Sequence, residues 1–98
     1  MSKRDKRLKK WMFDTPTTVP KNELVSIVKY FFPNNWRMER TSHLIVWHED
    51  LKQFKQYLPY GEITLPCSKG QQYKGRYVKE LVKAIELLGY WSPEEVKK

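Results

Sequence analysis

Cysteine is nearly absent from this chain of 98 residues, because Cys67 is its only example. One cysteine excludes an internal disulfide framework and a cysteine-rich zinc site, and we expect Cys67 to be an ordinary small residue that follows a strand. No apolar run approaches the roughly 20 residues that a membrane-spanning helix needs. The basic N-terminus also lacks the apolar stretch of a signal peptide. The sequence therefore predicts a cytoplasmic protein that does not contact a membrane.

Several catalytic motifs are absent as well. The chain has no G-x-G-x-x-G fingerprint, no P-loop, no H-E-x-x-H and no G-x-S-x-G. Its two histidines, His43 and His48, stand at i and i+5, a spacing that directs the two rings of a strand to opposite faces. We therefore expect neither a metal site nor a cofactor.

Acidic residues are also few, since 11 Asp and Glu stand against 19 Lys and Arg, a formal net charge of +8. The chain is 40% hydrophobic and 14% aromatic, which is too apolar for a disordered segment. At this length the chain suffices for one small domain with its own core. The excess of positive charge predicts a polyanionic partner, and nucleic acid is the first candidate.

The positive charge is concentrated at the N-terminus, where residues 1–10 hold six basic residues and one acidic residue, a net +5. We interpret residues 1–19 as a basic arm with a short helix over residues 3–13, followed by a Thr/Pro-rich connector. A solvated arm and an arm that contacts phosphate are equally consistent with this composition. In either case the arm is expected to be an accessory that can be removed without loss of the fold.

The remaining pattern predicts two amphipathic helices and three strands. Pro20 suits the start of a helix, and apolar residues recur at helical spacing from Leu24 to Phe31. Residues 78–88 show a second helical stripe, which Gly89 closes. Strands are expected at residues 36–40, 44–47 and 62–65, and a polar loop is expected at residues 67–75.

An amphipathic helix must bury its apolar stripe, and a three-stranded antiparallel sheet offers a face against which two helices pack. We therefore predict an α+β fold: a two-layer α-β-β-β-α sandwich with both helices on one face of the sheet. This single domain is expected to span residues 20–92, followed by a short tail at residues 93–98. The other face of the sheet is expected to stay open to solvent, where its side chains are available for function.

His43 is the residue with the clearest catalytic potential. Alternation along its strand places His43 and Ile45 on one face and Leu44 and Val46 on the other. If Leu44 and Val46 face the helices, His43 lies on the open face. The simpler interpretation is a half-buried histidine that is hydrogen-bonded to backbone, and Ser42 beside it has an equally ordinary role as a turn residue.

A second cluster of positive charge straddles the expected N-terminus of the last helix. Backbone N–H groups and the helix dipole already favour a phosphate at such an end, so basic side chains strengthen the prediction of phosphate binding. Trp36 or Trp47 would stack on a nucleic-acid base if either lies on the open face, although both suit a core equally well. The basic residues expected to contact RNA are Lys69, Lys74, Arg76 and Lys79.

Together these features resemble the HicA-type toxin family. The resemblance rests on the α-β-β-β-α order, on the Thr-Ser-His motif at residues 41–43, and on the Ile-Thr-Leu-Pro stretch at residues 63–66. The resemblance also includes the Lys-Gly pair at residues 69–70 and the helix over residues 77–89. In total it covers most of the chain. The family motif at the second strand is Gly-Ser-His, so Thr41 stands where the family has glycine.

The resemblance implies a fold like that of the double-stranded-RNA-binding domain and the activity of a metal-independent mRNA interferase, which is an endoribonuclease. His43 stands at the position of the family's catalytic histidine, with Thr41 and Ser42 as the supporting turn. Members of the family are toxins of type II toxin–antitoxin systems. The resemblance therefore implies mRNA and a HicB-type antitoxin protein as partners, and no cofactor.

Two other interpretations remain open. A non-catalytic RNA-binding domain of the same fold would use the same basic residues, and the replacement of the motif glycine by Thr41 keeps this interpretation open. A β-branched residue does not readily adopt the positive φ that glycine allows, so the turn before His43 is expected to differ from the family's. A purely protein-binding domain would neither bind nor cleave RNA.

Overall fold

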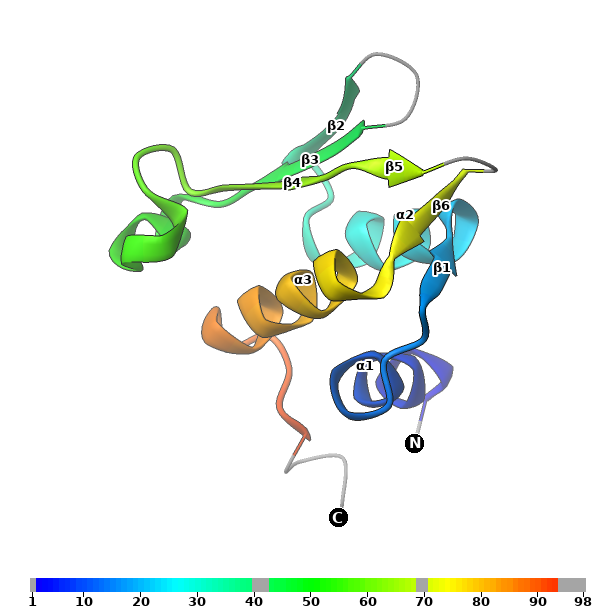
Figure 1. Ribbon diagram of the computed structural model, residues 1–98. Helices are drawn as coiled ribbons and strands as arrows, with labels where there is room; N and C mark the ends of the chain where they lie inside the picture. Colours follow the sequence, from blue (N-terminus) through cyan, green and yellow to red (C-terminus); the bar gives the residue numbers. More distant parts are fainter. Residues whose placement is uncertain (1, 40–42, 69–70, 94–98) are drawn as a thin grey trace.

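The computed structural model describes residues 2–39, 43–68 and 71–93, and it shows an α+β protein (Figure 1). Its helices are α1 (Lys3–Phe13), α2 (Lys21–Phe31) and α3 (Gly75–Leu87), with two short 3-10 helices, η1 (Glu49–Gln53) and η2 (Lys55–Tyr57). The predicted α+β class is confirmed. Within the described ranges, no helix has the length and apolar character needed to cross a bilayer.

The central sheet consists of the three strands that the sequence predicts. β2 (Trp36–Glu39), β3 (His43–Trp47) and β4 (Glu62–Leu65) are antiparallel and lie in the order β2-β3-β4. In this register Leu44 lies opposite Met38 on one side and opposite Leu65 on the other. The β-branched and aromatic residues of β3 suit its central place, because such side chains pack well on a pleated surface.

A second small sheet lies where the sequence indicates a connector and a polar loop. β1 (Thr18–Pro20), β6 (Gln72–Lys74) and β5 (Cys67–Ser68) are antiparallel in the order β1-β6-β5. The expectation of a loop over residues 67–75 is therefore wrong. Strands of two or three residues are too short for an alternating pattern, and β1 pairs with a strand more than fifty residues away, so no local signal marks them.

The layers are visible in Figure 1, where α2 and α3 lie on the same side of the central sheet and α1 lies beyond α3. The core forms between the sheet and the helices. Its fully buried side chains include Leu24, Val28, Leu44, Val46, Leu65, Val78, Leu81, Val82 and Ile85. These are the apolar stripes of α2 and α3, as the helical spacing predicts, and one face of β3 and β4. Ile45, on the other face of β3, is also buried, with an exposed fraction of 5%.

The basic N-terminal segment is a structural part of this core. The exposed fractions of Leu8 and Trp11 on α1 are 0% and 2%, and Met12 is also buried. The Arg7 side chain reaches Glu23 on α2, with 3.8 Å between Nε and Oε1. The helix expected over residues 3–13 is confirmed, but its packing contradicts the expectation of an accessory arm.

Gly75, the first residue of α3, allows the connector after α1 to lie directly against this helix. Its N–H donates a hydrogen bond to the Thr17 carbonyl oxygen over 2.8 Å. A methyl group in place of its Cα hydrogen would overlap the Pro16 carbonyl oxygen and meet the Thr15 methyl group. Glycine at this position therefore brings residues 15–18 close to the N-terminus of α3.

Candidate nucleic-acid interface

A basic hollow lies at the N-terminus of α3. The hollow is bounded on one side by the connector that Gly75 holds in place and on the other by the end of β6 and the first turns of α3. Its lining residues are Thr15, Pro16, Thr17, Thr18, Lys74, Gly75, Arg76 and Lys79. We call this set the α3 hollow. It brings together three of the four basic residues that the sequence indicates, whereas Lys69 lies outside the described residues.

The electrostatics of the α3 hollow favour an anion. Lys74 is the N-cap of α3, no side chain caps this end, and no acidic residue occurs in the first turn. The partial positive charge of the helix dipole therefore adds to the charges of Lys74, Arg76 and Lys79. Among the residues that the structure describes, no ion pair joins these three side chains to a carboxylate. Arg76 instead lies over the ring of Tyr77, with 4.9 Å from its guanidinium carbon to the ring centroid.

His43 is the first residue of β3 and is half-buried. The two fully buried residues of β3, Leu44 and Val46, belong to the core and therefore face the helices. His43 therefore lies on the sheet face opposite the helices. Across the strand pair it lies opposite Glu39 of β2. Thr41 and Ser42, the expected supporting turn, lie outside the described residues.

The two tryptophans of the sheet lie on different faces. Trp36 is partly buried against the core, and the Lys29 ammonium lies 5.9 Å from its ring centroid. Trp47 shares the outer face with His43, and the Arg37 guanidinium lies 5.3 Å from its ring centroid. Trp47 is therefore the one of the two that lies on the outer face of the sheet.

The α3 hollow and His43 do not belong to one cavity. His43 is not among the residues that line the hollow, and its side chain projects from the sheet face that points away from α3. The two are connected through the chain, because His43 begins β3 beside the point where β4 ends and β5 leads to β6 and α3. The two therefore lie on different faces of the structure, on either side of this end of the sheet.

The structure also shows a histidine contact that no local pattern predicts. The Nδ1 atom of His48 accepts a hydrogen bond from the Asp50 N–H at 3.0 Å, so Nε2 carries the proton of the neutral ring. Nε2 lies 2.6 Å from the Tyr90 hydroxyl oxygen. His48 thus has a structural role on the core side of the sheet, opposite the face of His43. The described residues contain no cluster of three side chains suited to hold a metal ion.

Comparisons with known proteins give no relative for this chain. No protein-family model matches it, and neither the curated proteins nor the solved structures give a significant match.

Proposed function

We propose that this chain is an RNA-cleaving toxin of the HicA type, with a fold like that of the double-stranded-RNA-binding domain, which binds mRNA at the α3 hollow and cleaves it with His43. The observation that carries this proposal is the convergence of Lys74, Arg76 and Lys79 at a helix N-terminus that no side chain caps. Backbone N–H groups and cations at such an end are suited to bind phosphate groups. RNA supplies these groups at regular intervals.

The arrangement of the elements supports the same proposal. The order α2-β2-β3-β4-α3, with both helices on one side of an antiparallel sheet, is the arrangement that the resemblance implies. The additional elements are α1 and the small sheet of β1, β6 and β5. Both pack around α3 and leave the outer face of the central sheet, with His43, available to a substrate.

The proposed reaction needs one histidine and the 2′-hydroxyl group of the RNA itself. The neutral imidazole of His43 removes the 2′-hydroxyl proton, and the resulting oxygen attacks the adjacent phosphorus. The bond from phosphorus to the 5′ oxygen breaks, and this oxygen takes a proton from water. The products are a 2′,3′-cyclic phosphate and a 5′-hydroxyl end. General acid–base catalysis of this kind accelerates a reaction by roughly 10²–10⁴-fold, which makes the proposed enzyme slow.

The proposed partners follow from the same chemistry. Lys74, Arg76 and Lys79 would bind phosphates without a preference for sequence, because charge contacts do not distinguish bases. A HicB-type antitoxin that covers His43 or the α3 hollow would need an acidic surface to match the net charge of +8. The proposed site of action is the cytoplasm, where mRNA is available.

The decisive experiment is incubation of an end-labelled mRNA with the protein in the presence of EDTA. We expect fragments with 2′,3′-cyclic phosphate ends, which disappear with the variant His43→Ala. The variant Glu39→Gln changes the residue opposite His43 without removing the base and serves as the matched control. Cleavage that persists in His43→Ala would overturn the catalytic assignment.

A non-catalytic RNA-binding domain is the second candidate, because His43 does not line the α3 hollow. This candidate predicts salt-sensitive RNA binding with no fragments at any time of incubation. The combined variant Lys74→Gln, Arg76→Gln and Lys79→Gln should weaken binding under both proposals. Only the first proposal also predicts slower cleavage in that variant.

A further inference from the structure

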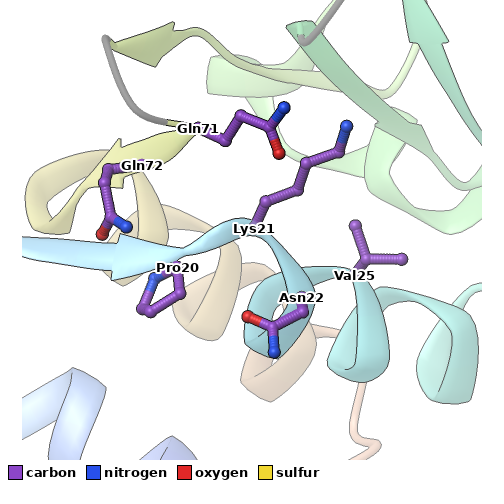
Figure 2. Close-up of a pocket in the computed structure, with 6 residues that line it drawn as sticks. All are labelled: Pro20, Lys21, Asn22, Val25, Gln71 and Gln72. Carbon is purple, nitrogen blue, oxygen red and sulfur yellow. The ribbon is translucent and has the colours of Figure 1, made fainter.

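A row of three adjoining hollows follows the exposed side of α2. Figure 2 shows the first of them, where the side chains of Lys21, at the start of α2, and of Gln71, just before β6, extend in the same direction. Adjoining hollows share residues along the helix: Asn22 and Val25 belong to the first two, and Tyr30 belongs to the second and third. The row is lined by Pro20, Lys21, Asn22, Val25, Gln71 and Gln72, then Arg4, Ser26 and Lys29, and finally Tyr30, Phe31 and Tyr90. We call it the α2 groove.

The lining of the α2 groove is cationic and contains no carboxylate. Its charged residues are Arg4, Lys21 and Lys29, and among the described residues none of them forms an ion pair. The acidic residue of α2, Glu23, lies in a different hollow and pairs with Arg7. The charge of the groove is therefore complementary to a polyanion.

Aromatic rings gather at the far end of the α2 groove. The exposed fractions of Tyr30 and Tyr90 are 56% and 46%, so part of each side chain is open to a ligand. The rings of Phe31 and Tyr90 are nearly parallel, with 6.3 Å between their centroids and an interplanar angle of 10°. The Arg4 guanidinium lies over the Tyr30 ring, 3.4 Å from its centroid, so it covers one face of the ring and adds a positive charge beside it.

The position of Tyr90 is fixed by its contacts with His48. Its hydroxyl group contacts His48 Nε2 at 2.6 Å, and the two rings meet edge to face, with 5.6 Å between centroids. A tyrosine fixed by its hydroxyl presents its ring with little loss of conformational entropy on binding. The aromatic end of the groove is therefore preorganised.

We propose that the α2 groove binds a single-stranded segment of RNA, with phosphates on Arg4, Lys21 and Lys29 and unpaired bases on Tyr30 and Tyr90. Proteins that bind single-stranded nucleic acids combine a basic groove, which contacts the phosphates, with exposed aromatic rings, on which the bases stack. A duplex keeps its base faces covered and does not fit this surface. Helix α2 has 11 residues, about 16 Å, which accommodates a few nucleotides. The proposal rests on the proposed function, in which RNA is the ligand of this protein. It adds a second RNA-binding surface, which has no preference for base sequence.

The test is fluorescence anisotropy with a labelled single-stranded 2′-O-methyl RNA, which lacks the hydroxyl group that the proposed cleavage needs. We expect Tyr30→Leu and Tyr90→Leu each to raise the Kd by roughly five- to a hundredfold, the range for loss of one stacking contact. Tyr90→Phe keeps the ring but loses the contact with His48, so it should weaken binding less than Tyr90→Leu does. The matched control is Tyr60→Leu, because Tyr60 is 69% exposed but does not line the groove.

The salt dependence of binding gives a second measurement. Arg4→Gln and Lys29→Gln should each reduce the slope of log K against log salt by about 0.7, the value for one phosphate contact on a single strand. Lys55→Gln, on η2 and outside the groove, should leave the slope unchanged. An unchanged Kd in both tyrosine-to-leucine variants, or tighter binding of a duplex of the same sequence, would overturn the proposal.

These outcomes separate the groove from the proposed cleavage. If the tyrosine variants lose affinity while His43→Ala still cleaves RNA, the groove stands and the catalytic proposal fails. If cleavage depends on His43 but the tyrosine variants bind RNA normally, the groove proposal fails alone. If the tyrosine variants bind RNA normally and lose only a complex with a protein partner, the groove is a protein interface, and the proposal is wrong.

Discussion

The imidazole Nε2 atom of His48 lies 2.6 Å from the hydroxyl oxygen of Tyr90, and this contact joins the end of β3 to the segment that follows α3. The other ring nitrogen accepts the Asp50 N–H at the start of η1. The same ring also meets Phe32 edge to face, with 6.3 Å between centroids. One histidine thus links the sheet, the end of α2 and the chain after α3.

Removal of this hydrogen bond should have a small effect on stability. We expect Tyr90→Phe to lower the free energy of unfolding by about 1 kcal/mol, since the lost bond is part-exposed and water replaces it. Urea denaturation followed by tryptophan fluorescence measures this change. Tyr60→Phe, which alters an exposed tyrosine on the loop before Gly61, should have no effect. A loss of several kcal/mol in Tyr90→Phe would show that the contact organises more of the structure than we infer.

Deletion of α1 should destabilise the whole domain. A chain that begins at residue 14 lacks the buried side chains of Leu8, Trp11 and Met12, and burial of each contributes about 1.5–3 kcal/mol. A small domain has a total stability of about 5–15 kcal/mol, so we expect the truncated chain to be largely unfolded by circular dichroism. Lys6→Gln with Lys10→Gln removes charge but keeps the apolar face, and this variant should fold normally. A well-folded truncated chain would show that α1 is dispensable.

Tyr73 should make the domain sensitive to alkaline pH. Burial, together with a smaller contribution from the nearby Cys67, raises the pKa of Tyr73 from its ordinary value of 10.0 to about 12. The neutral phenol is therefore favoured in the folded state, so the contribution of Tyr73 to stability is fully present below about pH 9 and is lost between pH 10 and 12. The expected loss at pH 12 is about 2–3 kcal/mol, from a shift of two pKa units.

The variant Tyr73→Phe isolates this effect, because it keeps the ring but cannot ionise. Thermal unfolding at pH 8 and pH 11 should show a smaller difference for Tyr73→Phe than for the unchanged protein. Burial also raises the pKa of Tyr57, with a further contribution from Glu80, so some sensitivity should remain. Identical pH profiles for the two proteins would contradict the assignment to Tyr73.

Gln71 offers a substitution that should increase stability. Its φ is +58°, in the left-handed region that costs a residue with a side chain about 1–2 kcal/mol. Glycine removes this cost and loses roughly 0.5–1 kcal/mol in chain entropy, so Gln71→Gly should stabilise the domain by up to about 1 kcal/mol. The neighbouring residue provides the control: Gln72 lies in β6 opposite Pro20, and Gln72→Gly should be destabilising. The two melting temperatures should therefore move in opposite directions.

Residues with strong periodicity predict most of the fold. The apolar stripe from Leu24 to Val28 on α2 and the buried residues of α3 follow helical spacing. Alternation along β3 separates Leu44 from His43, but the structure decides that Leu44 lies on the core side. The sequence of α1 also carries such a stripe, since Leu8, Trp11 and Met12 stand at i, i+3 and i+4. The six basic residues in the same segment favour the interpretation as an accessory arm. This interpretation is misleading, because charge on one side of a helix does not prevent burial of its apolar side.

The candidate site was less predictable than the fold. Alternation puts His43 on the face opposite Leu44 but does not decide which of the two faces meets the helices. It also does not show that Lys74, Arg76 and Lys79 converge beside Thr15 and Thr17. That arrangement depends on the pairing of β1 with β6 and on the close approach of Gly75 to Pro16. The contact between His48 and Tyr90 is similarly distant in the chain. Long-range pairings of this kind leave no periodic signal in a single sequence.

The pairing of β1 with β6 has a consequence during synthesis on the ribosome. One wall of the α3 hollow comes from residues 15–18, and the other comes from residues 74–79. A nascent chain that has exposed the first segment but not the second holds one wall without the other. The RNA-binding surface proposed for α3 therefore assembles only after residues 74–79 have left the ribosome.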